Sequence, residues 1–214
     1  MAYNLHIFGD SFAVSKHEIE RNNWVHQIAS HYNAQVVCHA ENGANLFHTM
    51  YQYHFARNMA KQLFDNDICI VVLTGACRSP IPTCTQTWVD WYEKFIKSEV
   101  NIEMNYAWTE AVIWPFVRSL ANTNTIVISA FHDFKRDESI DYWMTGDSLV
   151  TIAHNEMICD PKTFHWGRET RRNHLSPENH DILAQKIINF IDNPSPETRT
   201  IDASDFVKRC YLKL

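Results

Sequence analysis

The chain has 214 residues, of which 45% are hydrophobic and 21% are charged, a balance typical of a globular protein with one sizeable core. Its formal net charge is -6, and no lysine and arginine run stands out, which argues against a nucleic-acid-binding surface. No apolar run approaches the roughly 20 residues of a membrane span. The N-terminus has no basic region followed by an apolar one, so no signal peptide is predicted.

The cysteines and histidines predict neither disulfides nor a metal site. The six cysteines contain no C-x-x-C pair, so we expect free thiols and a reducing, cytoplasmic location. The twelve histidines are scattered and lack the ligand spacings of structural zinc. No metal and no other cofactor is predicted.

Strand and helix patterns alternate along the chain. Short apolar runs predict strands, in chain order, at 5–8, 34–38, 68–73, 125–129 and, as a shorter fifth, 149–153. Helical spacing of apolar residues predicts helices at about 16–32, from 45 onward, and at 106–120, the last kinked at Pro115. The segment 132–146 is polar and predicted to be a loop, and the long excursion 74–101 contains a helical stretch, WVDWYEKFI.

Two of the predicted helices carry clear apolar rows. The helix after residue 45 has an i, i+4 row of Phe47, Tyr51, Phe55, Met59 and Leu63. The last helix is predicted to begin at Pro177, with Ser176 as its N-cap. Its predicted buried face consists of Leu183, Ala184, Ile187, Ile188 and Ile191.

The chain order predicts one α/β domain over residues 1–193, followed by a C-terminal tail over 194–214. Strands that alternate with helices imply right-handed crossovers and a parallel sheet, here of about five strands. The prolines of the segment 193–196 end the last helix. The tail holds an apolar set that a partner could cover: Ile201, Phe206, Val207, Tyr211 and Leu212.

Three polar segments directly follow predicted strands: Gly9–Ser11, Asn42–Asn45 and Thr74–Arg78. Ligands of open parallel sheets bind outside the carboxyl ends of the strands. The sequence therefore predicts that these segments line one rim, which is the candidate site.

The end blocks of the chain resemble the SGNH, or GDSL-type, hydrolases. Gly9-Asp10-Ser11 resembles their nucleophile block, and the segment NHLSPENHDILA that contains His174 looks like their last block. Asn42-Gly43-Ala44 resembles the block whose glycine amide binds the oxyanion. The resemblance implies a flavodoxin-like, three-layer α/β/α sandwich in which Ser11 attacks an ester carbonyl. It also implies that His174 accepts the serine proton and later protonates the leaving alcohol. It also implies that the amides of Ser11 and Gly43 bind the oxyanion.

Two positions depart from the family pattern. An aspartate usually stands three residues before the histidine, where this chain has Arg171; Glu169, Asp160 or a backbone carbonyl could substitute. The usual oxyanion asparagine after the third strand is replaced in the run Gly75-Ala-Cys-Arg78. Arg78, in a pattern that looks like a variant seen in SGNH-like proteins of tailed phages, and Asn45 are candidate donors.

A second literal GDSL motif, Gly146–Leu149, precedes a predicted strand instead of following one. A serine there would point away from the rim, so we interpret this copy as a turn.

The leading prediction is a serine hydrolase that cleaves an acetyl or acyl ester on a carbohydrate or lipid through a Ser11–His174 dyad. The alternative is a degenerate SGNH domain with a binding or structural role, such as a virion component, located in the host cytoplasm or the virion. For that role we expect a homo-oligomer or a virion partner that docks on the tail. Neither nucleic acid nor a membrane is an expected partner. A flavin or nucleotide binder is less well supported, because G-D-S-F-A lacks a phosphate loop.

Overall fold

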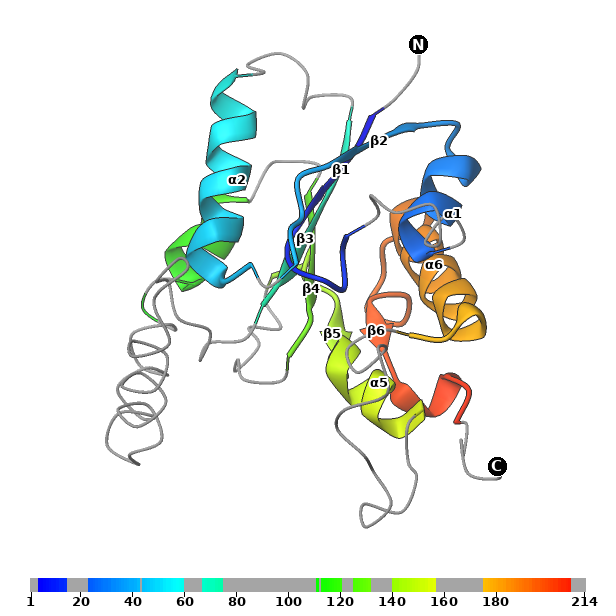
Figure 1. Ribbon diagram of the computed structural model, residues 1–214. Helices are drawn as coiled ribbons and strands as arrows, with labels where there is room; N and C mark the ends of the chain where they lie inside the picture. Colours follow the sequence, from blue (N-terminus) through cyan, green and yellow to red (C-terminus); the bar gives the residue numbers. More distant parts are fainter. Residues whose placement is uncertain are drawn as a thin grey trace, which may run out of the picture.

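A computed structural model describes residues 4–14, 23–42, 44–59, 67–74, 111, 113–120, 125–131, 140–156 and 175–208. Its centre is a parallel sheet with strand order β2-β1-β3-β4 (Figure 1). The strand bounds are β1 Asn4–Phe8, β2 Gln35–Cys38, β3 Ile68–Leu73 and β4 Thr125–Ser129. These four strands confirm the first four predicted from the sequence.

The inner strands β1 and β3 are buried at every residue after the first, because helices cover both faces of the sheet. Ile7 of β1 pairs with Cys38 of β2 on one side and with Ile70 of β3 on the other. Cys38 and Cys69 are free thiols, as predicted. Burial raises the pKa of the Cys69 thiol to about 12, so it behaves as a small apolar side chain.

Helices form a layer on each side of the sheet (Figure 1). On one side, α1 Trp24–His31, α5 Leu149–Glu156 and α6 Pro177–Asp192 enclose a buried cluster that includes Trp24, Leu149 and Leu183. On the other side, α2 Leu46–Met59 and the helical residues 113–119 enclose a second cluster with Phe8 and Tyr53. The predicted three-layer α/β/α fold is therefore confirmed, with four strands in the main sheet among the described residues.

The predicted fifth strand at 149–153 is wrong, because these residues begin helix α5. Ser148 precedes the helix, and its Oγ accepts a hydrogen bond from the Thr151 amide at 3.4 Å, which is N-cap geometry. The buried residues of this stretch have helical rather than alternating spacing: Leu149, Val150, Ile152 and Ala153.

The part of the predicted loop 132–146 that the structure describes is ordered against the sheet. Trp143 forms a single parallel bridge with Val127 of β4 and is fully buried. Immediately after it, β5 Thr145–Gly146 pairs with β6 Thr200–Ile201 in a small parallel sheet. The aromatic and apolar residues 140–144 therefore extend the core beyond β4, which the polar composition of the segment concealed.

The first helix is shorter than predicted. Asn23 has extended backbone angles, and its side chain accepts a hydrogen bond from the His26 amide, so α1 begins at Trp24. A helix that runs without interruption from residue 16 is therefore wrong, because the N-cap ends it on that side.

The aromatic row of α2 is not its buried face. Tyr51 is 65% exposed and Phe55 is 54% exposed, and their rings stack with centroids 5.9 Å apart. The face of α2 that packs on the sheet carries Tyr53 and Ala56 instead. Tyr53 is positioned by its ring contact with Phe8 and by a hydrogen bond to Thr125 of β4.

The last helix agrees with its prediction. Ser176 is the N-cap and Pro177 occupies the first turn of α6. The predicted face is buried at Leu183, Ala184, Ile187 and Ile188, and Ile191 packs partly buried against the same cluster. The helix ends at Asp192, before the predicted break.

The described part of the tail packs on the domain. Ile201 and Phe206 are 1% and 5% exposed and belong to the same buried cluster as α1 and α6. The amide side chain of Asn179 makes two hydrogen bonds with the backbone of Val207, at 2.8 and 3.0 Å. Ile201 and Phe206 are therefore not available to a partner, whereas Val207 is 37% exposed. Tyr211 and Leu212 lie outside the described residues.

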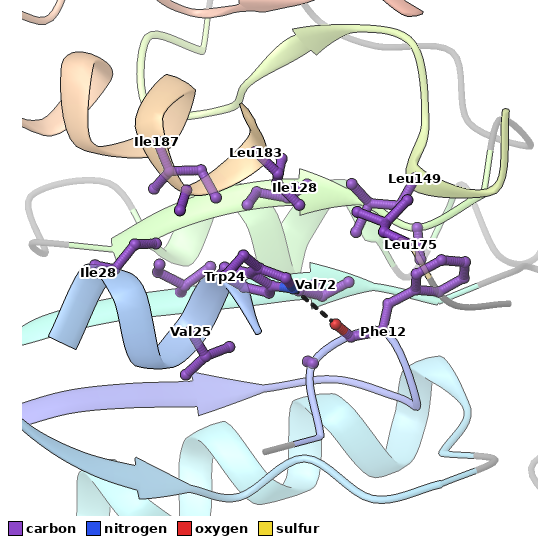
Figure 2. Close-up of a cluster of buried hydrophobic side chains, with 14 of the residues drawn as sticks. Phe12, Trp24, Val25, Ile28, Val72, Ile128, Leu149, Leu175, Leu183 and Ile187 are labelled. Carbon is purple, nitrogen blue, oxygen red and sulfur yellow. Dashed lines mark hydrogen bonds between the residues drawn. The ribbon is translucent and has the colours of Figure 1, made fainter. Parts of the chain in front are cut away.

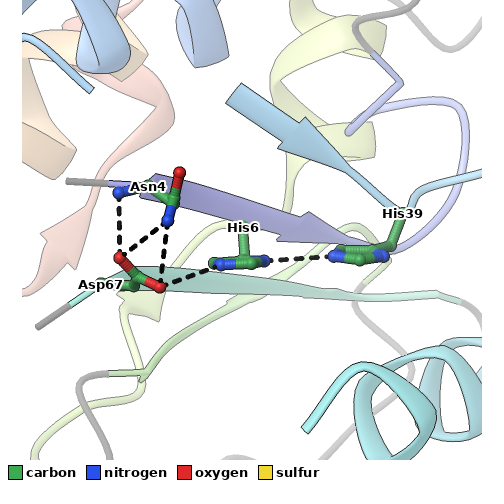
Figure 3. A network of polar contacts seen from close by, with 4 residues as sticks. All are labelled: Asn4, His6, His39 and Asp67. Atoms are coloured by element: carbon green, nitrogen blue, oxygen red, sulfur yellow. Dashed lines mark hydrogen bonds and ion pairs between the residues drawn. The ribbon is translucent and has the colours of Figure 1, made fainter. Parts of the chain in front are cut away.

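A polar network lies within the sheet between β1 and its neighbours (Figure 3). Nε2 of His6 contacts Asp67 at 3.2 Å, and Nδ1 of His6 lies 3.2 Å from Nε2 of His39. Asp67 also accepts hydrogen bonds from the backbone and side chain of Asn4. Burial of His6 lowers the pKa of its ring, although the Asp67 carboxylate opposes this.

Candidate active site

Ser11 lies in a tight turn at the carboxyl end of β1. Gly9 has a φ of +140°, and a Cβ at this residue would lie 2.8 Å from the carbonyl oxygen of Val72. Asp10 is fully buried, and its Oδ1 accepts a hydrogen bond from the Phe12 amide at 3.1 Å. Ser11 is partly exposed. The turn thus buries the aspartate and leaves the serine at the surface.

The segment after Ser11 is fixed to the core by α1 (Figure 2). The Trp24 indole nitrogen donates a hydrogen bond to the Phe12 carbonyl at 2.9 Å, and both side chains are buried. Asn23, the N-cap of α1, donates from its side chain to the Val14 carbonyl at 3.3 Å. Ser11 therefore lies on a turn whose following residues, Phe12 and Val14, are fixed by two hydrogen bonds.

The segment after β2 runs along the same turn. The Glu41 amide donates a hydrogen bond to the Gly9 carbonyl at 3.1 Å. Asn45 then acts as the N-cap of α2, since its Oδ1 accepts a hydrogen bond from the His48 amide at 2.8 Å. This places Asn45, a predicted oxyanion donor, at the start of α2.

A carboxylate–histidine pair, which the sequence analysis did not single out, lies in this region. Oε2 of Glu41 is 3.3 Å from Nε2 of His48, with the two side chains 56% and 41% exposed. The residues are seven apart and belong to a loop and a helix, so no sequence spacing signals the contact.

The chain enters α6 on the same side of the sheet as the turn that follows Ser11. Leu175 and Phe12 belong to one buried cluster, together with Leu149 (Figure 2). His174, Gly43 and Arg78, the other predicted catalytic and oxyanion residues, lie outside the described residues, as does Arg171. The structure thus describes Gly9, Asp10, Ser11 and Asn45 of the predicted site.

The second GDSL motif connects the end of β5 to helix α5, so it does not precede a strand as predicted. Gly146 has a φ of +90° against the backbone of Ile201, and Asp147 accepts a hydrogen bond from the Ala203 amide at 2.8 Å. Ser148 is fully buried and caps α5. A buried capping hydroxyl is not accessible to a substrate.

Neither a metal centre nor a membrane span is found in the part of the chain that the structure describes. These residues contain no group of three or more histidine, cysteine, aspartate or glutamate side chains that could hold a metal ion. None of the described helices is long and apolar enough to cross a membrane.

No protein-family model and no curated protein matches the chain. Among solved structures, the chain is similar to the psychrotrophic esterase EstA from Pseudoalteromonas sp., in a structure inhibited by monoethylphosphonate. The TM-score is 0.51 at 9% sequence identity, and the match covers 88% of this chain and 96% of the esterase. The chain therefore shares its fold with an esterase over nearly its whole length.

Proposed function

We propose that the protein is an SGNH-type serine hydrolase that cleaves an acetyl or acyl ester of a carbohydrate or lipid. The observation that carries the proposal is the position of Ser11. It is a partly exposed serine on a glycine-dependent turn, directly after the first strand of a fold shared with an esterase.

In the proposed reaction, the Ser11 Oγ attacks the ester carbonyl while His174 accepts its proton. The tetrahedral oxyanion is bound by the amides of Ser11 and Gly43, with Arg78 or the Asn45 side chain as a further donor. The bond between the acyl carbon and the alcohol oxygen then breaks, and the alcohol leaves with a proton. The acyl group remains on Ser11 until water attacks it, and the serine oxygen regains its proton as the free acid forms.

Two features support the pairing of Ser11 with His174. Leu175, which directly follows His174 in the sequence, shares a buried cluster with Phe12, which directly follows Ser11. The Ser176 cap then fixes the start of α6. Consecutive Cα atoms are about 3.8 Å apart, so each proposed catalytic residue is one peptide away from the same cluster.

A second candidate function is a degenerate SGNH domain with a binding role in a larger assembly, for example a tailed-phage particle. Two features favour it: Arg171 replaces the usual aspartate, and the oxyanion asparagine after β3 is absent. An exposed Val207 at the end of the described tail is where such a partner would dock.

Labelling with a fluorophosphonate probe, followed by peptide mapping, tests the two functions. The hydrolase proposal expects an adduct at Ser11 that Ser11→Ala abolishes. Ser148→Ala is the matched control, because Ser148 has the same motif but is buried under α5. A folded protein that forms no adduct at Ser11 would refute the hydrolase and leave the binding role.

A further inference from the structure

We propose that Glu41 and His48 form a second acid–base pair at the candidate site, in which His48, in place of His174, protonates the leaving alcohol and Glu41 orients the His48 ring. This inference rests on the proposed hydrolysis at Ser11. It assigns to the site two residues that lie outside the motifs described above.

The pair is connected to the Ser11 turn through the backbone. Glu41 donates its amide proton to the carbonyl of Gly9, two residues before Ser11. The Ala44 amide donates to the Glu41 carbonyl at 3.0 Å, which turns the chain back toward the start of α2. Asn45 caps that helix through the His48 amide, so His48 is held in its first turn.

The exposure of the pair suits contact with a substrate. The side chains of Glu41 and His48 are 56% and 41% exposed, so both are accessible to solvent, and the Glu41 backbone is bonded to Gly9 just beyond the carboxyl end of β1. Two other histidine–carboxylate pairs lie away from this rim. His6 and Asp67 are buried within the sheet, and His31 and Asp192 lie at the carboxyl ends of α1 and α6.

The chemistry of the proposed dyad leaves a role for such a pair. Arg171 replaces the carboxylate that usually supports the catalytic histidine. A cation cannot accept a hydrogen bond from an imidazole or offset the charge of an imidazolium. Glu41 is a carboxylate in contact with a ring nitrogen of His48, so His48 has the kind of carboxylate partner that the run before His174 lacks.

The proton transfers balance when the two histidines divide them. In acylation, His174 takes the Ser11 proton, the serine oxygen bonds to the acyl carbon, and the bond to the alcohol oxygen breaks as His48 gives that oxygen a proton. In deacylation, His48 takes a proton from water, the hydroxide oxygen bonds to the acyl carbon, and the Ser11 oxygen leaves with the proton held by His174. Since Glu41 contacts Nε2, the proton is carried on Nδ1 of His48.

Leaving-group dependence tests this assignment. An alkyl alcohol must be protonated as it leaves, whereas nitrophenolate leaves as a stable anion. In His48→Ala we expect kcat/KM for an alkyl acetate to fall about 100-fold, while that for nitrophenyl acetate changes less than about 3-fold. Glu41→Gln should reduce only kcat/KM for the alkyl ester, by a smaller factor. Added imidazole should restore alkyl ester turnover to His48→Ala.

His31→Ala is the matched control, because it breaks a histidine–carboxylate pair of similar separation and exposure, at 3.6 Å and with 47% and 43% of the side chains exposed. His31→Ala should change kcat/KM for neither ester. Equal losses on both esters in His48→Ala, or no loss on the alkyl ester, would overturn the role of His48. Fluorophosphonate labelling separates this from the parent proposal. Fluoride leaves without a proton, so His48→Ala should still be labelled at Ser11, whereas an unlabelled wild-type protein refutes the hydrolase itself.

Discussion

Gly9 lies so close to Val72 that a Cβ at residue 9 would be 2.8 Å from the Val72 carbonyl oxygen and 2.9 Å from its Cβ. The contact joins the turn after β1 to the carboxyl end of the neighbouring strand β3. Both the positive φ of Gly9 and this contact exclude any side chain at this position.

Gly9→Ala is therefore expected to destabilise the protein by about 2–4 kcal/mol, from the backbone strain and the overpacking together. Urea denaturation followed by circular dichroism measures the loss. Ser11→Ala is the control, because it leaves the turn intact and its partly exposed side chain should cost little. An unchanged unfolding midpoint in Gly9→Ala would show that the turn can relax away from β3.

Ser148→Ala should affect stability rather than labelling. The hydroxyl caps α5 through the Thr151 amide and also lies 3.0 Å from the Thr151 hydroxyl. Loss of an N-cap costs about 1 kcal/mol, measurable as a lower urea midpoint with unchanged slope. Ser148→Asp, which keeps an acceptor at the cap, should recover part of the loss unless the buried site rejects a charge. Loss of fluorophosphonate labelling in Ser148→Ala would contradict the assignment of the nucleophile.

The stability of the protein should rise with pH through the titration of His6. Burial lowers the pKa of His6 below its ordinary value of 6.5, so between the folded-state value and 6.5 the unfolded chain binds more protons than the folded one. The free energy of unfolding therefore increases as pH rises through that window, and the contribution is complete above about 6.5. Urea unfolding at several pH values measures this slope.

In His6→Asn the contribution of His6 to this slope should disappear, and the free energy of unfolding at neutral pH should fall by about 1–3 kcal/mol, because buried partners of the ring lose a hydrogen bond. His31→Ala removes an exposed histidine and serves as the control for the slope. An identical pH dependence in His6→Asn and the wild-type protein would show that other groups produce the effect.

Asn179 of α6 holds the tail segment around Val207 against the helix. It is fully buried, and it donates to and accepts from the backbone of Val207. Asn179→Ala should lower the free energy of unfolding by about 1–3 kcal/mol, because two part-buried hydrogen bonds with the backbone of Val207 are lost. It should also increase proteolytic cleavage after residue 196.

Lys186→Ala is the comparison, since it breaks the Lys186–Asp205 ion pair between the same segments at a more exposed position. An exposed pair is worth about 1 kcal/mol or less. If the protease cleaves the two variants at the same rate, the hydrogen bonds between Asn179 and Val207 do not hold the tail in place.

Local sequence patterns were sufficient for the four main strands, the Ser176 cap and the face of α6, because apolar spacing and capping chemistry act within a few residues. The glycine turn at residues 9–11 was also recognisable, since it follows an apolar strand directly. These features depend on interactions between residues close together in the sequence. The second GDSL motif was set aside because a strand was predicted after it, and that strand is a helix; the burial of Ser148 is what excludes it as a nucleophile.

Only the tertiary structure decided which of several apolar faces is buried. The row of Tyr51 and Phe55 has ideal helical spacing, yet α2 turns Tyr53 and Ala56 toward the sheet. The stretch after Ser148 satisfies a strand pattern equally well, but it forms a helix whose Leu149 and Ile152 pack in the buried cluster with α1 and α6. Ile201 and Phe206 look like a docking surface in the sequence but fill the core beside α6. The contact of Glu41 with His48 likewise forms in a loop whose backbone is hydrogen-bonded to Gly9. In each case, the deciding contacts join segments whose separation along the chain carries no local signal.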